Sequence, residues 1–243
     1  MAAATQSIRQ IVAADPSAAA VFERFQIDLC SQADHALGRV CADLQLSVDQ
    51  LLDKLAEVAS QAKGAIAPDL ERYSLTRLIQ HIVRTHHQAI RQELPRFAEM
   101  AGKIAAQQNG QAPQFMAVAR LIDQLRAELM AHIEKEEQAL FPYIVELEEA
   151  KKNDLPAPKG QFRSVAQPLS MMIREHEVAE WIVEQLRQST NGFVHPEWAC
   201  PRNVAFHADL AAFDKNLRRH VQLENDLLFP RAIALEAQLA QRR

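Results

Sequence analysis

Apolar side chains recur every three or four residues along most of this chain, which is the period of an amphipathic α-helix. Pairs of breaking residues and a loop rich in Pro and Lys interrupt the pattern. Four long helices are therefore predicted, at about residues 74–108, 113–151, 168–191 and 201–240. Pro95 is expected to bend the first of them, and Asn109-Gly110 to end it.

The order of these segments is a helix pair, a loop and a second helix pair. This order predicts an up-down four-helix bundle built by duplication, over residues 73–241. The first part of the chain, residues 1–62, is predicted to be a small helical module. In it, Asp15-Pro16 is expected to begin one helix and Ser47-x-x-Gln50 to cap another. With only 6 glycines in 243 residues, the composition supports an all-α fold.

One motif occurs twice. It reads His-x-x-x-Glu-x-x-x-Leu-Phe-Pro and covers residues 132–142 and 220–230. Each copy follows a single histidine at nearly the same distance, since His87 precedes His132 by 45 residues and His176 precedes His220 by 44. The repeated helix pair therefore carries two equivalent sets of histidine and glutamate.

These polar residues lie on the faces that should be buried. A spacing of four places His132 and Glu136 about 40° apart on one helix face, and that face is otherwise apolar. A buried ionised glutamate costs several kcal/mol or more unless it is paired, protonated or coordinated. A dinuclear metal centre satisfies both sets together. Its predicted ligands are His87, His132, Glu136, His176, His220 and Glu224, with two histidines per ion and both glutamates bridging.

The residues alone leave other interpretations open. The same ligand types also suit zinc and manganese, and a hydrogen-bonded polar core without any metal is the simplest structural explanation. His87 is preferred to His86 because it alone lies in phase with Val83 and Ile90. Glu128 and Glu175 are candidates for acceptors of the outer histidine N–H groups.

The two prolines of the motif, Pro142 and Pro230, each remove one helical hydrogen bond in the turn after the glutamate. Such turns either open the bundle beside the site or merely fit the helix packing. The sequence favours neither explanation.

Charge and cysteine content narrow the class of protein. A net charge of −4 without a Lys/Arg cluster argues against nucleic-acid binding. No apolar run is long enough to span a membrane, so we expect a cytoplasmic protein. Its three cysteines, Cys30, Cys41 and Cys200, form no C-x-x-C pair, and we expect reduced thiols and no disulfide.

The chain resembles the hemerythrin-like di-iron proteins, and more closely the repair-of-iron-centres family of the ScdA/YtfE type. The resemblance covers nearly the whole chain, and its bundle motifs are highly specific. The matching segments are residues 22–30 in the small module and His81–His87, His132–Pro142, Glu175–Glu177 and His220–Pro230 in the bundle. Position by position, the resemblance implies the same six ligands, holding two oxo-bridged iron ions per chain.

The resemblance further implies a cytoplasmic protein of the response to nitrosative and oxidative stress. Such a protein supports the repair of damaged iron-sulfur clusters and binds nitric oxide, and damaged iron-sulfur proteins would be its partners. No nucleophile–base pair or nucleotide-binding loop is visible, so a conventional enzyme is not expected. The sequence leaves open whether the small module forms a homodimer.

One departure from the family affects this expectation. The family's small module normally carries two adjacent cysteines, whereas this chain has Cys30 followed by Ser31. Cys30 is then either reactive or a small buried apolar residue. The missing thiol shifts weight towards an alternative function, as a cytoplasmic nitric-oxide-binding sink or sensor linked to denitrification and without repair activity. A hemerythrin-type oxygen carrier or sensor ranks behind both.

Overall fold

The computed structural model describes residues 3–61, 69–107, 113–158, 162–195 and 199–241. These residues are mostly helical; they form no named strand, and one isolated β-bridge joins Ser7 and Ala36. The all-α prediction is confirmed. The chain divides into two compact units, one of Met1–Ala67 with Thr190–Ala212 and one of Pro68–Ser189 with Phe213–Arg243. The sequence did not predict that Thr190–Ala212 would group with the N-terminal residues.

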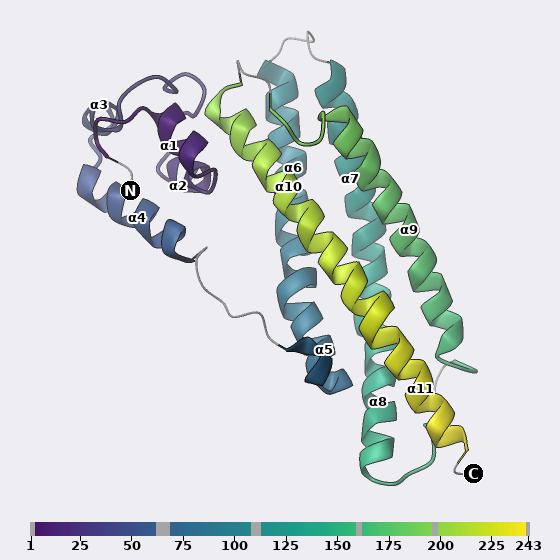
Figure 1. The fold of residues 1–243 in the computed structure, drawn as a ribbon. Helices are drawn as coiled ribbons and strands as arrows, with labels where there is room; N and C mark the ends of the chain where they lie inside the picture. The colour runs from purple at the N-terminus through teal and green to yellow at the C-terminus, as the bar shows by residue number, and fades with distance from the viewer. Residues whose placement is uncertain (1–2, 62–68, 108–112, 159–161, 196–198, 242–243) are drawn as a thin grey trace. The chain divides into compact units, whose positions relative to one another are not determined.

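The first unit begins with α1 (Ile8–Ala14), α2 (Ala18–Arg24), α3 (Leu37–Asp43) and α4 (Val48–Gln61) (Figure 1). Ser7 and Gln10 form a capping box at the start of α1. At the start of α4, Ser47 Oγ accepts the Gln50 N–H at 3.3 Å, as predicted. The apolar faces of these helices meet in one core, whose fully buried members include Ile8, Val12, Phe22, Leu37, Val40, Leu51 and, from the later helix α10 (Pro201–Gln222), Ala205.

Two predictions for this unit need correction. The helix expected at Asp15-Pro16 begins only at Ala18, because the Asp15 carboxylate accepts the Ser17 N–H at 3.1 Å and stabilises a turn before the helix. The expectation of reduced thiols is also wrong, since Cys30 and Cys200 form a disulfide across 170 residues of sequence. Cys41 is a free, buried thiol.

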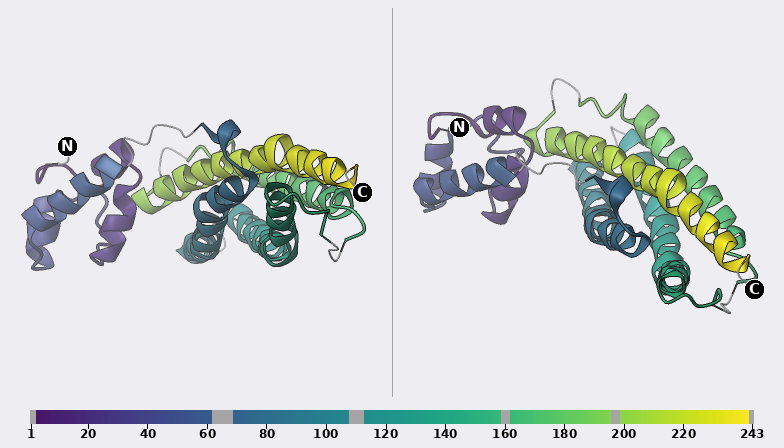
Figure 2. Two further views of the ribbon diagram at one scale, coloured as in Figure 1. Left: turned by 90° about the horizontal axis from the view of Figure 1, so that it is seen from below. Right: turned by 60° about the horizontal axis from the view of Figure 1, so that its bottom comes forward.

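The second unit is built from long helical rods that lie side by side in Figures 1 and 2. A short 3-10 turn, η1 (Leu70–Arg72), precedes the first rod, which consists of α5 (Leu75–Ile82), η2 (Val83–His87) and α6 (Gln88–Gln107). The second rod consists of α7 (Pro113–Lys135), η3 (Glu136–Leu140) and α8 (Phe141–Lys152), and the third is α9 (Ala166–Ser189). The fourth rod consists of α10 from Phe213 on, η4 (Leu223–Leu228) and α11 (Phe229–Ala240). Helix α7 packs against both α6 and α9, and α8 packs against α5 and α11. The η2, η3 and η4 segments are π-helical.

The rods match the four predicted helices closely at the ends that the structure describes. Helix α6 continues through Pro95. The expected stop at Asn109-Gly110 lies outside the described residues, as does most of the predicted boundary between the two domains, at residues 62–68. The division into domains 1–62 and 73–241 therefore stays a prediction. No described helix is both long and apolar enough to cross a membrane.

A carboxylate from α8 caps the first turn of α5. Glu148 accepts the Leu75 N–H at 2.7 Å and the Thr76 N–H at 3.0 Å. Although burial acts in the opposite direction, the hydrogen bonds from Thr76 and Leu75 hold the pKa of Glu148 below its ordinary value. Two segments far apart in sequence are thus joined by hydrogen bonds that are strongest when the carboxylate is ionised.

Replacing Glu148 with alanine should lower the free energy of unfolding by about 1–2 kcal/mol, because two helix N–H groups lose their acceptor. Urea denaturation at neutral pH measures the loss. Since the folded pKa is depressed, the stabilisation is present above the unfolded pKa and should disappear as the pH falls through the folded value. Glu146→Ala, at an exposed position of α8, is the control, and an equal loss in both variants would contradict the capping role.

Candidate metal centre

The four histidines and two glutamates of the duplicated motif come together inside the second unit. Their exposed fractions lie between 0% and 2%. They form two groups, His87, Glu136, His220 and Glu224, and His132, Glu136, His176 and Glu224, and within each group the ligand atoms lie within 4.8 Å of one another. Both glutamates belong to both groups.

The histidine Nε2 atoms meet in two close pairs. Those of His87 and His220 are 3.1 Å apart, and those of His132 and His176 are 3.0 Å apart. Two nitrogens that each lie about 2.1 Å from one ion, at right angles, are about 3.0 Å apart. The side chains therefore already have the spacing of two ligands on one ion. Each pair takes one histidine from each repeat, so the two groups are made across the repeats rather than within them.

The two carboxylates lie between the histidine pairs. Glu224 Oε1 is 2.9 Å from His220 Nε2, and its Oε2 is 3.0 Å from His176 Nε2. Each oxygen of Glu224 thus faces a different pair. Glu136 Oε2 lies 3.4 Å from the Nε2 atoms of both His87 and His132, and neither of its oxygens has a hydrogen-bond partner. Buried carboxylate oxygens without partners fit a site that a cation completes.

Each motif glutamate lies in a π-helical turn. The Phe141 N–H bonds to the Glu136 carbonyl, and the Phe229 N–H bonds to the Glu224 carbonyl, each five residues back. Pro142 and Pro230 follow these turns directly and have no N–H to continue the regular helical ladder. Each repeated proline thus follows a widened helical turn that contains the motif glutamate.

The phenylalanine of each Leu-Phe-Pro segment covers one histidine. Phe141 stacks on His87 with ring centres 5.7 Å apart, and Phe229 stacks on His176 at 6.1 Å. Both contacts join the motif to the upstream histidine of the same repeat. Because these two rings are buried, they separate the two histidines from water on one side.

The outer Nδ1 atoms of three histidines have acceptors. His87 Nδ1 lies 2.7 Å from Glu137, His132 Nδ1 lies 3.0 Å from Glu175, and His176 Nδ1 lies 3.0 Å from Asn225 Oδ1. Such acceptors fix the ring orientation and leave Nε2 free to bind a metal. His220 Nδ1, by contrast, is buried without a hydrogen-bond partner.

Sequence reasoning found Glu175 but missed Glu137 and Asn225. These two residues directly follow Glu136 and Glu224, so the repeat itself held the signal: a polar residue next to each glutamate. Glu128, the other candidate, is exposed on α7. His86, which was not chosen as a ligand, bonds to Asn216 and stacks on His220 at 5.8 Å.

The buried carboxyl and imidazole groups of the site have pKa values that are shifted in different directions. Burial and the neighbouring Glu224 raise the pKa of Glu136 to about 8. Burial opposes the charged form of His87, but the carboxylates of Glu136 and Glu224 outweigh it and raise the pKa of His87 to about 10. For Glu224, burial is outweighed by His220 and His176, which hold its pKa well below the ordinary value. The carboxylates and imidazoles thus share protons that a bound cation would displace.

An all-α bundle with a buried cluster of four histidines and two shared glutamates defines a metal-binding helical protein. Comparison with known proteins agrees with this class. The family model described as "Hemerythrin HHE cation binding domain" matches residues 78–232. The ScdA_N model, described as a domain of unknown function, matches residues 4–59.

Relatives match the chain along nearly its full length. The iron-sulfur cluster repair protein YtfE of Pectobacterium atrosepticum is 31% identical, over 96% of this chain and 99% of that protein. The proteins of the same name from Enterobacter sp. and Escherichia coli O81 are 30% and 29% identical, each over 97% of this chain and 100% of the relative. The chain therefore belongs to the hemerythrin-like family, and within it to the ScdA/YtfE-type proteins.

Glu137 offers a test of the outer contacts, because it accepts from His87 Nδ1 and also pairs with Arg91, at 2.9 and 3.0 Å. Glu137→Ala should weaken metal binding about 10- to 100-fold, since the His87 ring loses its orientation. Competition with a chromophoric chelator measures the affinity. The Glu128→Ala variant, changed on the exposed face of α7, should bind the metal as tightly as the unmodified chain. An unchanged metal affinity in Glu137→Ala would show that Glu137 does not support metal binding.

Proposed function

We propose that this protein holds two oxo-bridged iron ions and supports the repair of damaged iron-sulfur clusters. In this proposal His87 and His220 bind one ion, His132 and His176 bind the other, and Glu136 and Glu224 bridge them. The observation that carries it is the pair of four-residue groups that share both glutamates. The family match and the names of the full-length relatives support iron and repair over the zinc and manganese alternatives.

The bound iron would supply redox chemistry and open coordination positions for a small ligand. The chain's own residues would determine what reaches it. Phe141 and Phe229 exclude water from one side of His87 and His176. Glu137 and Glu175, anchored by Arg91 and Lys135, would keep two outer N–H groups in place when the ions change charge.

We further propose that nitric oxide binds at this centre. The alternative function, a nitric oxide sink without repair activity, was based on the absence of a second thiol beside Cys30. Cys200 places a second cysteine sulfur beside Cys30 from a distant part of the chain, which removes that argument and favours repair. The matched arrangement, with one histidine pair for each ion, supports the oxygen carrier less well than either repair or the nitric oxide sink.

The decisive experiment treats an iron-sulfur hydro-lyase with nitric oxide and then adds the purified, iron-loaded protein under anaerobic conditions. Recovery of hydro-lyase activity is expected with the loaded protein. The matched control is the Glu136→Leu/Glu224→Leu variant carried through the same loading procedure, which should give no recovery. A nitrosyl spectrum without recovery and without loss of iron would support the sink, and no recovery with fully loaded protein would refute repair.

A further inference from the structure

We propose that Cys30 and Cys200 form a thiol–disulfide exchange site, whose substrates are thiols, with Cys200 as the attacked sulfur and Cys30 as the leaving thiolate. The proposal is independent of the metal centre, because neither sulfur belongs to a residue of that cluster. Both cysteines are partly accessible, whereas the third cysteine, Cys41, is fully buried. Exchange chemistry is thus restricted to one pair.

The sulfur of Cys30 lies beside a cation. The guanidinium of Arg202 donates to Cys30 Sγ at 3.7 Å. A cation beside a sulfur stabilises the thiolate over the thiol. Because the better-stabilised thiolate leaves faster in exchange, an incoming thiolate should attack Cys200 and expel Cys30.

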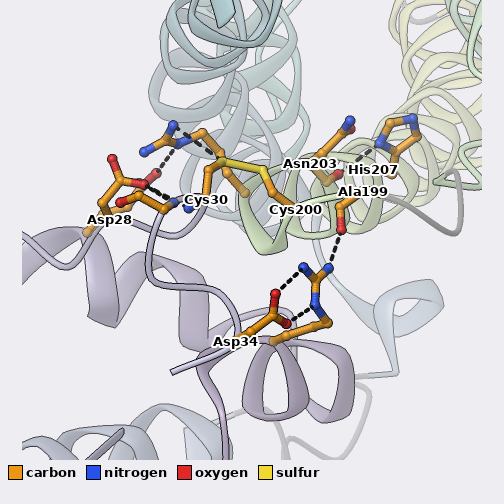
Figure 3. Close-up of a disulfide and its surroundings, with 11 residues drawn as sticks. Asp28, Cys30, Asp34, Ala199, Cys200, Asn203 and His207 are labelled. Carbon is orange, nitrogen blue, oxygen red and sulfur yellow. Dashed lines mark hydrogen bonds and ion pairs between the residues drawn. A yellow bond between two sulfur atoms is a disulfide. The ribbon is translucent and has the colours of Figure 1, made fainter. Parts of the chain in front are cut away.

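Backbone and side-chain bonds hold both cysteines in position independently of the disulfide (Figure 3). The Asp28 carboxylate accepts the Cys30 N–H at 2.8 Å and the Ser31 N–H at 2.9 Å. Arg9 joins the two segments, since it donates to Asp34 at 2.7 Å and to the Ala199 carbonyl, next to Cys200, at 2.7 Å. The sulfurs should therefore stay close after reduction, so that the bond can form again.

The reaction balances with two molecules of a monothiol. The first thiolate attacks Cys200 Sγ, a mixed disulfide forms there, and the electron pair of the broken bond goes to Cys30 as a thiolate. The second thiolate attacks the sulfur of the first, releases Cys200 as a thiolate and leaves as the oxidised dimer. The two protons lost by the monothiols return to Cys30 and Cys200. Two electrons are transferred in total.

Reduced glutathione is the probe, added without denaturant to the full-length protein with its metal. Samples are quenched with acid, free thiols are alkylated, and modified peptides are identified by mass spectrometry. We expect glutathione to appear first on Cys200, and Cys41 to stay unlabelled until the protein is unfolded. Glutathione first on Cys30, or a disulfide that is reduced only after unfolding, would overturn the proposal.

Arg202 provides the matched test. Arg202→Gln should slow reduction about threefold to tenfold, because the leaving thiolate loses its cation. Arg202→Lys keeps the charge and should retain most of the rate, which separates the electrostatic effect from any loss of packing. Arg39→Gln, in the same unit with a side chain 70% exposed, should react like the unmodified protein. Equal rates in all four proteins would contradict the assigned direction of attack.

Discussion

Glu136→Leu should abolish metal loading and at the same time stabilise the metal-free protein. Both Glu136 oxygens are buried without hydrogen-bond partners, and burial already raises the pKa of this carboxyl group to about 8. An apolar side chain of similar size removes that desolvation cost, and His87 keeps the Glu137 carboxylate as a partner at 2.7 Å. The free energy of unfolding should therefore rise, by at most the ~1–4 kcal/mol found when whole buried ion pairs are replaced by apolar side chains. Metal analysis after loading, together with urea denaturation of the chelator-treated protein, measures both effects.

Glu224→Leu should lose the metal without the same gain in stability. Glu224 accepts from His220 at 2.9 Å and pairs with His176 at 3.0 Å, so its removal takes the carboxylate partner away from the Nε2 atoms of two buried imidazoles. The two glutamates are equivalent in sequence but should differ in the metal-free protein. Glu128→Leu, an exposed position on α7, is the control for the substitution itself. Full loading of Glu136→Leu would show that this carboxylate is no ligand.

The helices and the buried cluster were predictable because both follow from periodicity. Residues such as His132 and Glu136 fall on an apolar helix face, and a repeat doubles the signal. The π-helical turns were not predictable, since a proline after Phe141 is compatible with a kink, a helix start or a widened turn. The sequence also did not predict that each histidine pairs with one from the other repeat, because this pairing depends on how the rods face one another.

The disulfide escaped prediction for a different reason. Cys30 and Cys200 are separated by 170 residues, and no spacing rule links cysteines so far apart. Their proximity depends on the packing of the segment before α10 in the first unit, for which the sequence gives no periodic signal. The covering phenylalanines, Phe141 and Phe229, were visible as a repeated motif, but their stacking on His87 and His176 needed the structure.

Removing the metal with a chelator should lower the unfolding temperature strongly. A ligand that binds only the folded chain stabilises it by about 4 kcal/mol when its free concentration is a thousand times its Kd. For a chain of this length, each kcal/mol corresponds to about 2–4 °C. The unfolding temperatures of the loaded and the chelator-treated protein, measured by calorimetry, should therefore differ by about 8–16 °C. The unfolding temperature of the Glu136→Leu variant should not change with the chelator.

Loading the protein with metal should release protons, and the affinity for the metal should rise with pH. In the absence of an ion, the pKa of His87 is raised to about 10 and that of Glu136 to about 8, so this pair retains at least one proton at neutral pH. A metal ligand must give its proton up, so binding competes with protonation and weakens as the pH falls from about 8 towards 6. Titration calorimetry in two buffers of different ionisation enthalpy counts the protons released. An affinity that does not change over this range, with no proton release, would mean that the ions bind somewhere other than between these six side chains.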